Sequence, residues 1–296
     1  MVLAVWATAP CVAHGQVDLT VGGTGISIGN SVGVNGLRFN FRDTRLEHVN
    51  GINTTIWLPK GGAKGVINGL AIGLPASGGA QINGLAVGGG LAVSHNVNGV
   101  LVAAGAGVGG NETGLTVAGL AFAAGQRLAG INVAGLAIAG GQQVWGLTVG
   151  GLAAASGGKL VGIGVGGLAT GAAGDVTGLL LGGLAAGAGG TVRGVAIGGL
   201  AAGAPTVRGI VIGGAASGGV NVDGLMLASM YTRIQNGQLN GASIGAVNDI
   251  RGRLQGVSIG IFNYARELHG LQLGLLNRAA NNHGLFGLLP LLNAHF

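Results

Sequence analysis

Apolar residues recur in one short pattern along most of this chain, written apolar–x–Gly–apolar–x–apolar–Gly. In Gly146-Leu147-Thr148-Val149 the residues one and three after the glycine are apolar, and the residue between them varies from copy to copy. An alternation with period two is typical of a β-strand, whose successive side chains point to opposite faces. We therefore predict a short strand in each copy, with Leu147 and Val149 facing inward and Thr148 facing outward.

The pattern occurs seventeen times, with spacings of 14 to 18 residues between the first glycines of successive copies. A repeat this regular indicates a solenoid, in which each copy is one structural unit. We expect the glycine to lie at a repeated corner or edge of the coil. The first glycines are Gly36, Gly51, Gly69, Gly84, Gly99, Gly114, Gly130, Gly146, Gly162, Gly178, Gly194, Gly209, Gly224, Gly241, Gly256, Gly270 and Gly284.

A second apolar position lies six residues after the glycine, as in Leu168 and Leu184, and alanine often follows it. Each copy therefore offers two short strands, too few residues to bury a core alone. Stacked copies would share hydrogen-bonded ladders and one interior. The predicted fold is all-β: a single thin β-solenoid of about 17 coils with 14–18-residue repeats.

The body of the repeat, residues 61–238, is flanked by two segments of different composition. Residues 16–60 contain more aromatic and charged side chains, and we predict an N-terminal cap with the first coils there. In residues 239–296, asparagine appears seven residues after the glycine, at Asn248, Asn263 and Asn277. Stacked amides at one position can bond to one another. We predict an inward structural asparagine ladder here, ending in a C-terminal cap.

Residues 1–15 have the features of a signal peptide. Residues 2–13 form an apolar stretch, and Ala13-His14-Gly15 has the small residues of a cleavage site. Cleavage near Gly15 would remove Cys11, the only cysteine. We therefore expect an exported protein, located in the periplasm or at the cell surface.

Composition narrows the classes of function. The chain has 68 glycines in 296 residues, only 7% charged residues and a formal net charge of +6. Its mean hydropathy of +0.62 is too high for ordinary disorder. Residues 65–232 carry four basic and three acidic side chains, so no continuous basic stripe exists. We expect no nucleic-acid partner, because binding to phosphates depends on such a stripe.

No constellation of catalytic or ligand-binding residues emerges from the spacing. Residues 105–110 match GxGxxG, but a chain so rich in glycine produces this match by chance. His269 and His283 each precede a motif glycine and could lie close enough to share a metal, with a third ligand such as His295 from elsewhere. We predict solvated histidines, no metal, no cofactor, no small-molecule substrate and no enzymatic activity.

The position two residues after the glycine, which we expect to face outward, provides a candidate partner interface. Four successive coils place apolar residues there, and exposed apolar patches mark interaction surfaces. Trp145, on the preceding outward row, provides a second candidate contact. The candidate interface comprises Leu180, Ala196, Val211, Met226 and Trp145.

Two segments carry a resemblance to known proteins. The ending GVSIGIFNYARELHGLQLGLLNRAANNHGLFGLLPLLNAHF and the segment VNGINTTIW, Val49 to Trp57, resemble bacterial exported "surface repeat-containing" proteins. This resemblance extends from about Val34 to the end of the chain and gives no information about activity. A second and weaker resemblance, carried by no motif, is to a membrane-extrinsic accessory subunit of a photosynthetic reaction centre–antenna complex.

We therefore expect a non-enzymatic, exported scaffold that docks on and stabilises a larger membrane protein assembly. The second resemblance would make that assembly a photosynthetic reaction centre–light-harvesting complex. Its partners would be membrane-protein subunits, with contact to the membrane surface. Two alternatives stay open: a cell-surface solenoid that binds a ligand or carbohydrate, and a self-assembling surface fibre.

Overall fold

A computed structural model describes residues 16–58, 64–93 and 95–296. The fold is all-β, with 77% strand and no α-helix among the described residues, and it forms a β-solenoid of about 16 turns with repeats near 15 residues. The prediction of a β-solenoid is confirmed. The segment 1–15, with Cys11 and the expected cleavage site, lies outside the described residues.

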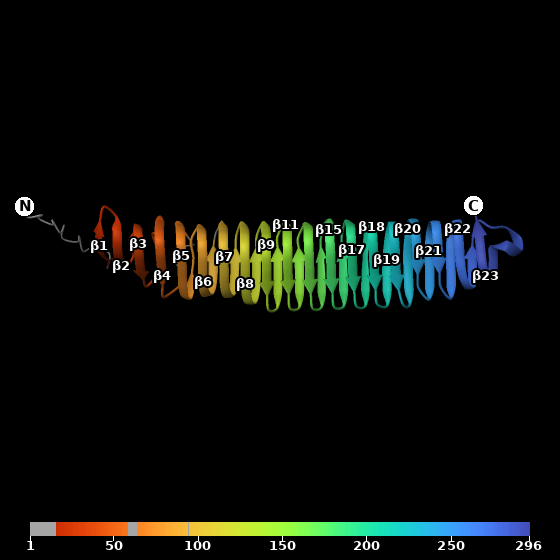
Figure 1. Ribbon diagram of the computed structural model, residues 1–296, viewed down its shortest axis with the longest axis horizontal. Helices are drawn as coiled ribbons and strands as arrows, with labels where there is room; N and C mark the ends of the chain where they lie inside the picture. The colour runs from red at the N-terminus through yellow and green to blue at the C-terminus, as the bar shows by residue number, and fades with distance from the viewer. Residues whose placement is uncertain (1–15, 59–63, 94) are drawn as a thin grey trace, which may run out of the picture. The chain divides into compact units, whose positions relative to one another are not determined.

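The chain divides into two compact units, residues 1–125 and 126–296. In the first unit, strands from β2 onward pair in parallel with the next strand along the chain. Figure 1 shows these strands stacked side by side. They are β1 (Val17–Val21), β2 (Thr24–Ile28), β3 (Gly33–Asn40), β4 (His48–Thr55), β5 (Val66–Ser77), β6 (Gln81–Val93), β7 (Asn96–Val108) and β8 (Asn111–Ala124).

In the second unit, coils up to residue 198 contain one longer and one short strand, and later coils merge the two into one strand. The parallel strands keep the motif in register, so that Gly146 pairs with Gly162 and Val149 with Val165. The elements are β9 (Arg127–Ala134), β10 (Ala137–Gly140), β11 (Gln143–Gly150), β12 (Ala153–Ser156), β13 (Lys159–Gly166), β14 (Ala169–Ala172), β15 (Val176–Gly182), β16 (Ala185–Ala188), β17 (Thr191–Gly198), β18 (Ala201–Gly213), β19 (Ala216–Ala228), β20 (Tyr231–Ile244), β21 (Val247–Ile259), β22 (Phe262–Ala279), the 3-10 helix η1 (Gly284–Gly287) and β23 (Leu288–His295).

The motif glycines form a column inside the strands, where we had expected a corner or an edge. From Gly36 to Gly270 they have φ between +103° and +145°, a backbone region that other residues rarely adopt. A Cβ atom added to Gly162 would lie only 2.2 Å from the carbonyl oxygen of Gly146 in the preceding coil. The repeat therefore requires glycine for its φ angle and for the close approach of neighbouring backbones.

The two faces of the first strand are the reverse of our prediction. Thr148 is 0% exposed, whereas its neighbours Leu147 and Val149 are half-buried on the outer side. The position two before the glycine, as in Val144, is also fully buried. The interior is therefore lined by the positions two before and two after the glycine, together with side chains from the second strand.

A narrow interior explains this arrangement. A Cβ atom added to Gly164 would lie 3.0 Å from Thr170 Oγ1, on the second strand of the same coil, and 3.1 Å from Leu180 Cδ2 in the next coil. Facing strands are thus separated by a single thin layer of side chains, in which large and small residues must compensate one another. The half-strand after the glycine therefore has residues of varied size inside and its constant Leu, Ile and Val positions outside.

An antiparallel pair of strands lies at the N-terminal end of the first unit, and another lies at the C-terminal end of the second unit. β1 pairs with β2, and β22 pairs with β23. Near the first of these ends, Arg38 is completely buried and is ion-paired with Asp43. Its guanidinium also donates to Asn53 Oδ1 at 2.7 Å and to the carbonyl oxygen of Ser31 at 3.1 Å. These bonds compensate the burial of a charge at a position where the other coils carry uncharged residues.

Candidate functional site

The predicted partner interface lies in the interior. Leu180, Ala196, Val211 and Met226 form one column through β15, β17, β18 and β19, and all four are 0% exposed. The prediction that these residues face outward is wrong, so they are not available to a partner. The alternation along the strand separates two faces but does not identify which of them is the interior.

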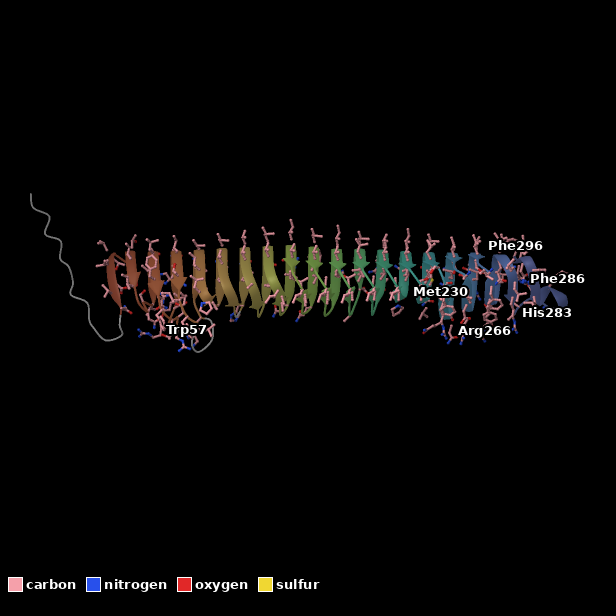
Figure 2. All side chains as sticks on the ribbon, turned by 90° about the horizontal axis from the view of Figure 1, so that it is seen from below. Trp57, Met230, Arg266, His283, Phe286 and Phe296 are labelled. Carbon is pink, nitrogen blue, oxygen red and sulfur yellow. The ribbon has the colours of Figure 1, made fainter. Side chains whose placement is uncertain are left out.

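The outer surface of the second unit instead carries two parallel apolar rows, which we call the apolar edge. The first row consists of the residues three positions after each motif glycine. The second row consists of residues at the bend that follows, where residues of successive coils are joined by backbone hydrogen bonds such as Leu184 N–H to Leu168 O at 2.7 Å. Leu168 is 48% exposed and Met230, labelled in Figure 2, is 65% exposed. The rows are Val133, Val149, Val165, Leu181, Ile197, Ile212, Leu227, Ile244, Ile259 and Leu273, and Leu136, Leu152, Leu168, Leu184, Leu200, Ala215, Met230, Ala246, Ile261 and Leu276.

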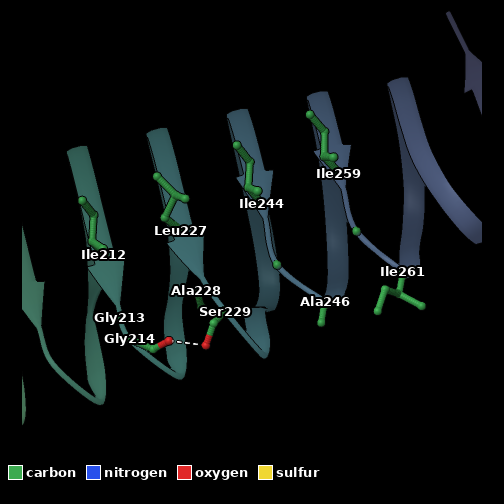
Figure 3. A pocket seen from close by; sticks show the side chains of 12 residues that line it. Ile212, Gly213, Gly214, Leu227, Ala228, Ser229, Ile244, Ala246, Ile259 and Ile261 are labelled. Carbon is green, nitrogen blue, oxygen red and sulfur yellow. Dashed lines mark hydrogen bonds between the residues drawn. The ribbon is translucent and has the colours of Figure 1, made fainter.

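A groove lies between the two rows of the apolar edge in its last coils. It has a volume of about 610 Å³ and is lined by residues from Ile212 to Ile261. Figure 3 shows Ile212, Leu227, Ile244 and Ile259 aligned on successive strands along one side. Glycine, alanine and one serine form the floor, and the Ser229 hydroxyl is satisfied by the carbonyl oxygen of Gly214. The groove therefore presents an aliphatic surface without a charged group.

The positions immediately before the motif glycines are more polar. Trp145 lies there, 39% exposed, and its indole N–H donates to Gln143 Oε1 at 3.2 Å. The guanidinium carbon of Arg127 lies 4.9 Å from the centre of the indole ring. Trp145 is thus on the surface, and its role as a partner contact stays a prediction. The glycine column separates this polar side of the coil from the apolar edge.

The predicted asparagine ladder is confirmed as a structural feature. The Asn248 amide donates to Asn263 Oδ1 at 2.7 Å, and the Asn263 amide donates to Asn277 Oδ1 at 2.8 Å. All three side chains are completely buried. The strand register aligns them with Thr232, Ser217 and Ala202, an inward row, and not with the exposed alanines seven residues after the glycine.

We did not predict a second asparagine ladder from the sequence. In the first unit, the residues just before five motif glycines bond in series, from Asn50 to Asn35 at 2.6 Å through to Asn98 and Asn83 at 3.0 Å. These amides lie on the exposed side of the strands. The repeated Asn-Gly dipeptide was the signal. The ladder consists of Asn35, Asn50, Asn68, Asn83 and Asn98.

The structure does not assemble a site from the candidate histidines or from the GxGxxG match. His269 packs edge-on against His295, with ring centres 5.8 Å apart, and His283 is not part of this contact. Among the described residues there is no group of three or more His, Cys, Asp or Glu side chains suited to a metal. The GxGxxG match spans the end of strand β7 and the bend after it, so it does not open a helix.

Within residues 16–58, 64–93 and 95–296, we find no helix with the length and hydrophobicity of a membrane-spanning segment. Comparisons of the chain with protein-family models, with curated proteins and with solved structures give no match.

Proposed function

We propose that this protein is a non-enzymatic structural scaffold that docks lengthwise on a larger membrane protein assembly through its apolar edge. The observation that supports this is the pair of aligned aliphatic rows, which contain no polar or charged residue over ten coils. A surface that only faced water would carry charges, and contiguous exposed apolar patches mark interaction sites.

The partner is argued from the chemistry of the edge. Docking buries the edge most favourably against a surface that is itself aliphatic, because each 100 Å² of apolar area removed from water contributes about 2.5 kcal/mol. Interfaces in permanent assemblies are more hydrophobic than those in transient ones, so a subunit of such an assembly is a suitable partner. The wall of the groove repeats once per coil, which suits a long contact more than a point contact. A photosynthetic reaction centre–light-harvesting complex is one such assembly, suggested by resemblance alone.

The test compares two triple variants in the native host. Leu168→Gln, Leu184→Gln and Leu200→Gln change the apolar edge, and Thr177→Gln, Arg193→Gln and Arg208→Gln change the polar side at the same coil spacing. After mild detergent extraction, we expect the wild type and the polar-side variant to co-purify with a membrane protein assembly, and the edge variant to lose it. Mass spectrometry and pigment absorbance would identify the assembly.

Two outcomes contradict the proposal. Equal co-purification of both variants would show that the apolar edge is not the docking surface. Flotation with protein-free vesicles as strong as with native membranes would show that the edge binds lipid and not protein.

The location in the periplasm or at the cell surface is part of the same proposal. N-terminal sequencing of the mature protein tests it, with cleavage near Gly15 as the expected result.

A further inference from the structure

We propose that the last coils of the second unit bind an acidic oligosaccharide in a groove lined by arginine and aromatic side chains. This inference is independent of the docking function. The groove has a volume of about 670 Å³, within the usual range for ligand sites. Strand register brings its aromatic residues together, because Tyr231 and Phe262 flank Val247 in one column and Tyr264 pairs with Asp249 in another.

The groove carries an excess of positive charge. Three arginines line it, Arg251, Arg266 and Arg278, against one carboxylate, Asp249. Asp249 already accepts bonds from the Tyr231 hydroxyl at 2.7 Å and from Arg251 Nε at 2.9 Å. Burial and the bond to Asp249 raise the pKa of Tyr231, which keeps its phenol protonated as the donor.

The other two arginines have no carboxylate partner among the described residues. Arg266 is exposed and projects from the edge of the ribbon in Figure 2. The guanidinium carbon of Arg278 lies 5.8 Å from the ring centre of Tyr264. A guanidinium that rests on an aromatic ring keeps its planar set of N–H donors free at the edge, where it can bind a carboxylate through two parallel bonds.

The site is elongated. A second hollow of about 380 Å³ shares Asn236, Arg251 and Arg266 with the first and adds Arg253, which is paired with Glu267 at 3.0 Å. A free phosphate or a single carboxylate would fill a small part of this length. A chain of several units, with acidic groups spaced along it, matches the two adjoining hollows, which share Arg251 and Arg266 and each add one further arginine.

Sugar rings account for the remaining features of the lining. The ring of Phe262 offers a flat apolar surface on which the C–H face of a sugar packs, and the Asn236 amide offers a donor and an acceptor for hydroxyl groups. A single-stranded nucleic acid also uses arginine and aromatic residues. Its regularly spaced phosphates favour a purely basic track, whereas this groove includes Asp249 and the Arg253–Glu267 pair.

Calorimetric titration of the full chain tests the proposal with three hexameric probes: an oligogalacturonate, the neutral maltohexaose and the oligonucleotide dT6. We expect saturable binding of the oligogalacturonate alone. The double variant Arg266→Gln with Arg278→Gln should weaken this binding about tenfold or more, since it removes two cationic hydrogen-bond donors from the groove. Arg208→Gln, an exposed arginine outside the groove, should leave binding unchanged.

The thermal midpoint of each variant, measured by circular dichroism, separates loss of the site from loss of the fold. Because Arg266 and Arg278 make no ion pair within the described coils, we expect all midpoints to match the wild type. Absence of saturable binding to oligogalacturonate, equal binding of maltohexaose, tighter binding of dT6, or undiminished binding by the double variant would each overturn the proposal. None of these outcomes affects the docking function, which depends on the apolar edge.

Discussion

Leu180 and Leu184 lie four residues apart in the same coil, yet Leu180 is 0% exposed and Leu184 is 46% exposed. Leu180 is in the interior column of β15, and Leu184 is at the bend that precedes β16. One leucine is therefore part of the interior, and the other is part of the outer surface. One contributes to stability and the other to the surface of the apolar edge.

Lysine at these two positions should have opposite consequences. Leu180→Lys places an unpaired charge in the interior, and we expect a loss of roughly 3–5 kcal/mol in the free energy of unfolding. Leu184→Lys keeps its ammonium group in water and should change stability by no more than about 0.5 kcal/mol. Urea titration followed by circular dichroism measures both. A similar loss for the two variants would contradict the assignment of the faces.

Thr148 provides a test in which a substitution in the interior should increase the stability of the protein. Its hydroxyl is buried and has no hydrogen-bond partner in the structure. Thr148→Val replaces that hydroxyl with a methyl group of similar size, and we expect a gain of about 1 kcal/mol because an unsatisfied polar group costs about 1–3 kcal/mol. Thr177→Val, at a half-buried position on the outer face, is the matched control and should be nearly neutral. Destabilisation by Thr148→Val would indicate that the hydroxyl has a partner.

The two asparagine ladders should differ in their contribution to stability. Asn263→Ala removes the acceptor of the Ser258 hydroxyl and the donor to Asn277 Oδ1, both buried. We expect a loss of about 3 kcal/mol, since both groups stay away from water. Asn98→Ala, in the exposed ladder, frees groups that water can bind and should cost less than about 1 kcal/mol. Chemical denaturation compares them, and equal costs would argue against the difference in burial.

Asp175 should give the protein a measurable dependence on acid. The N–H of Thr191, which donates to Asp175 Oδ1 at 2.8 Å, and the nearby charge of Arg193 hold the pKa of this carboxyl below its ordinary value of 3.8. A pKa lowered on folding stabilises the protein above the unfolded value, and that contribution is lost as the pH falls through the folded value. The thermal midpoint should therefore decline less on acidification in Asp175→Asn than in the wild type. Identical profiles would show that Asp175 does not couple folding to pH.

The glycine column should tolerate no side chain. Gly162→Ala forces a residue with a Cβ atom to φ of +121° and places that atom against the Gly146 carbonyl. We expect a loss of at least about 2 kcal/mol. Gly218→Ala is the control, since its Cβ would lie 3.7 Å from the nearest atom, the Arg233 carbonyl oxygen. Its effect should stay within about 1 kcal/mol, and a comparable loss in thermal melts of the two variants would show that the column is not constrained.

The repeat in the sequence was sufficient to predict the solenoid, because glycine spacing and strand alternation are local properties. The buried asparagines could also be predicted, since an amide repeated at one position of successive coils has few other uses. The assignment of faces failed at Thr148 and Met226 for a physical reason. A constant aliphatic position usually lies inside a globular domain, but here the interior is so thin that variable residues after the glycine fill it.

The groove near Tyr264 and Arg278 could not be found from spacing alone. These residues lie 14 positions apart, and Asn263 and Asn277, which directly precede them, bond to each other. Tyr264 and Arg278 therefore occupy equivalent positions in neighbouring coils. Tyr264 and Arg278 both lie eight residues after a motif glycine, but Tyr231 lies seven residues after Gly224 and pairs with Val247, six residues after Gly241, so the register changes within the cluster. Recognising the cluster required the register of each strand pair.

The glycine column also gives the second unit the properties of a ruler. Each coil meets its neighbours through the same backbone contact, so a whole coil such as residues 162–177 could be removed or duplicated without creating a new kind of junction. Each such event changes the length of the stack by one strand spacing, about 4.8 Å. The length of the apolar edge is thus set in equal steps by the number of copies in the gene, and selection could match it to the span of a partner one coil at a time.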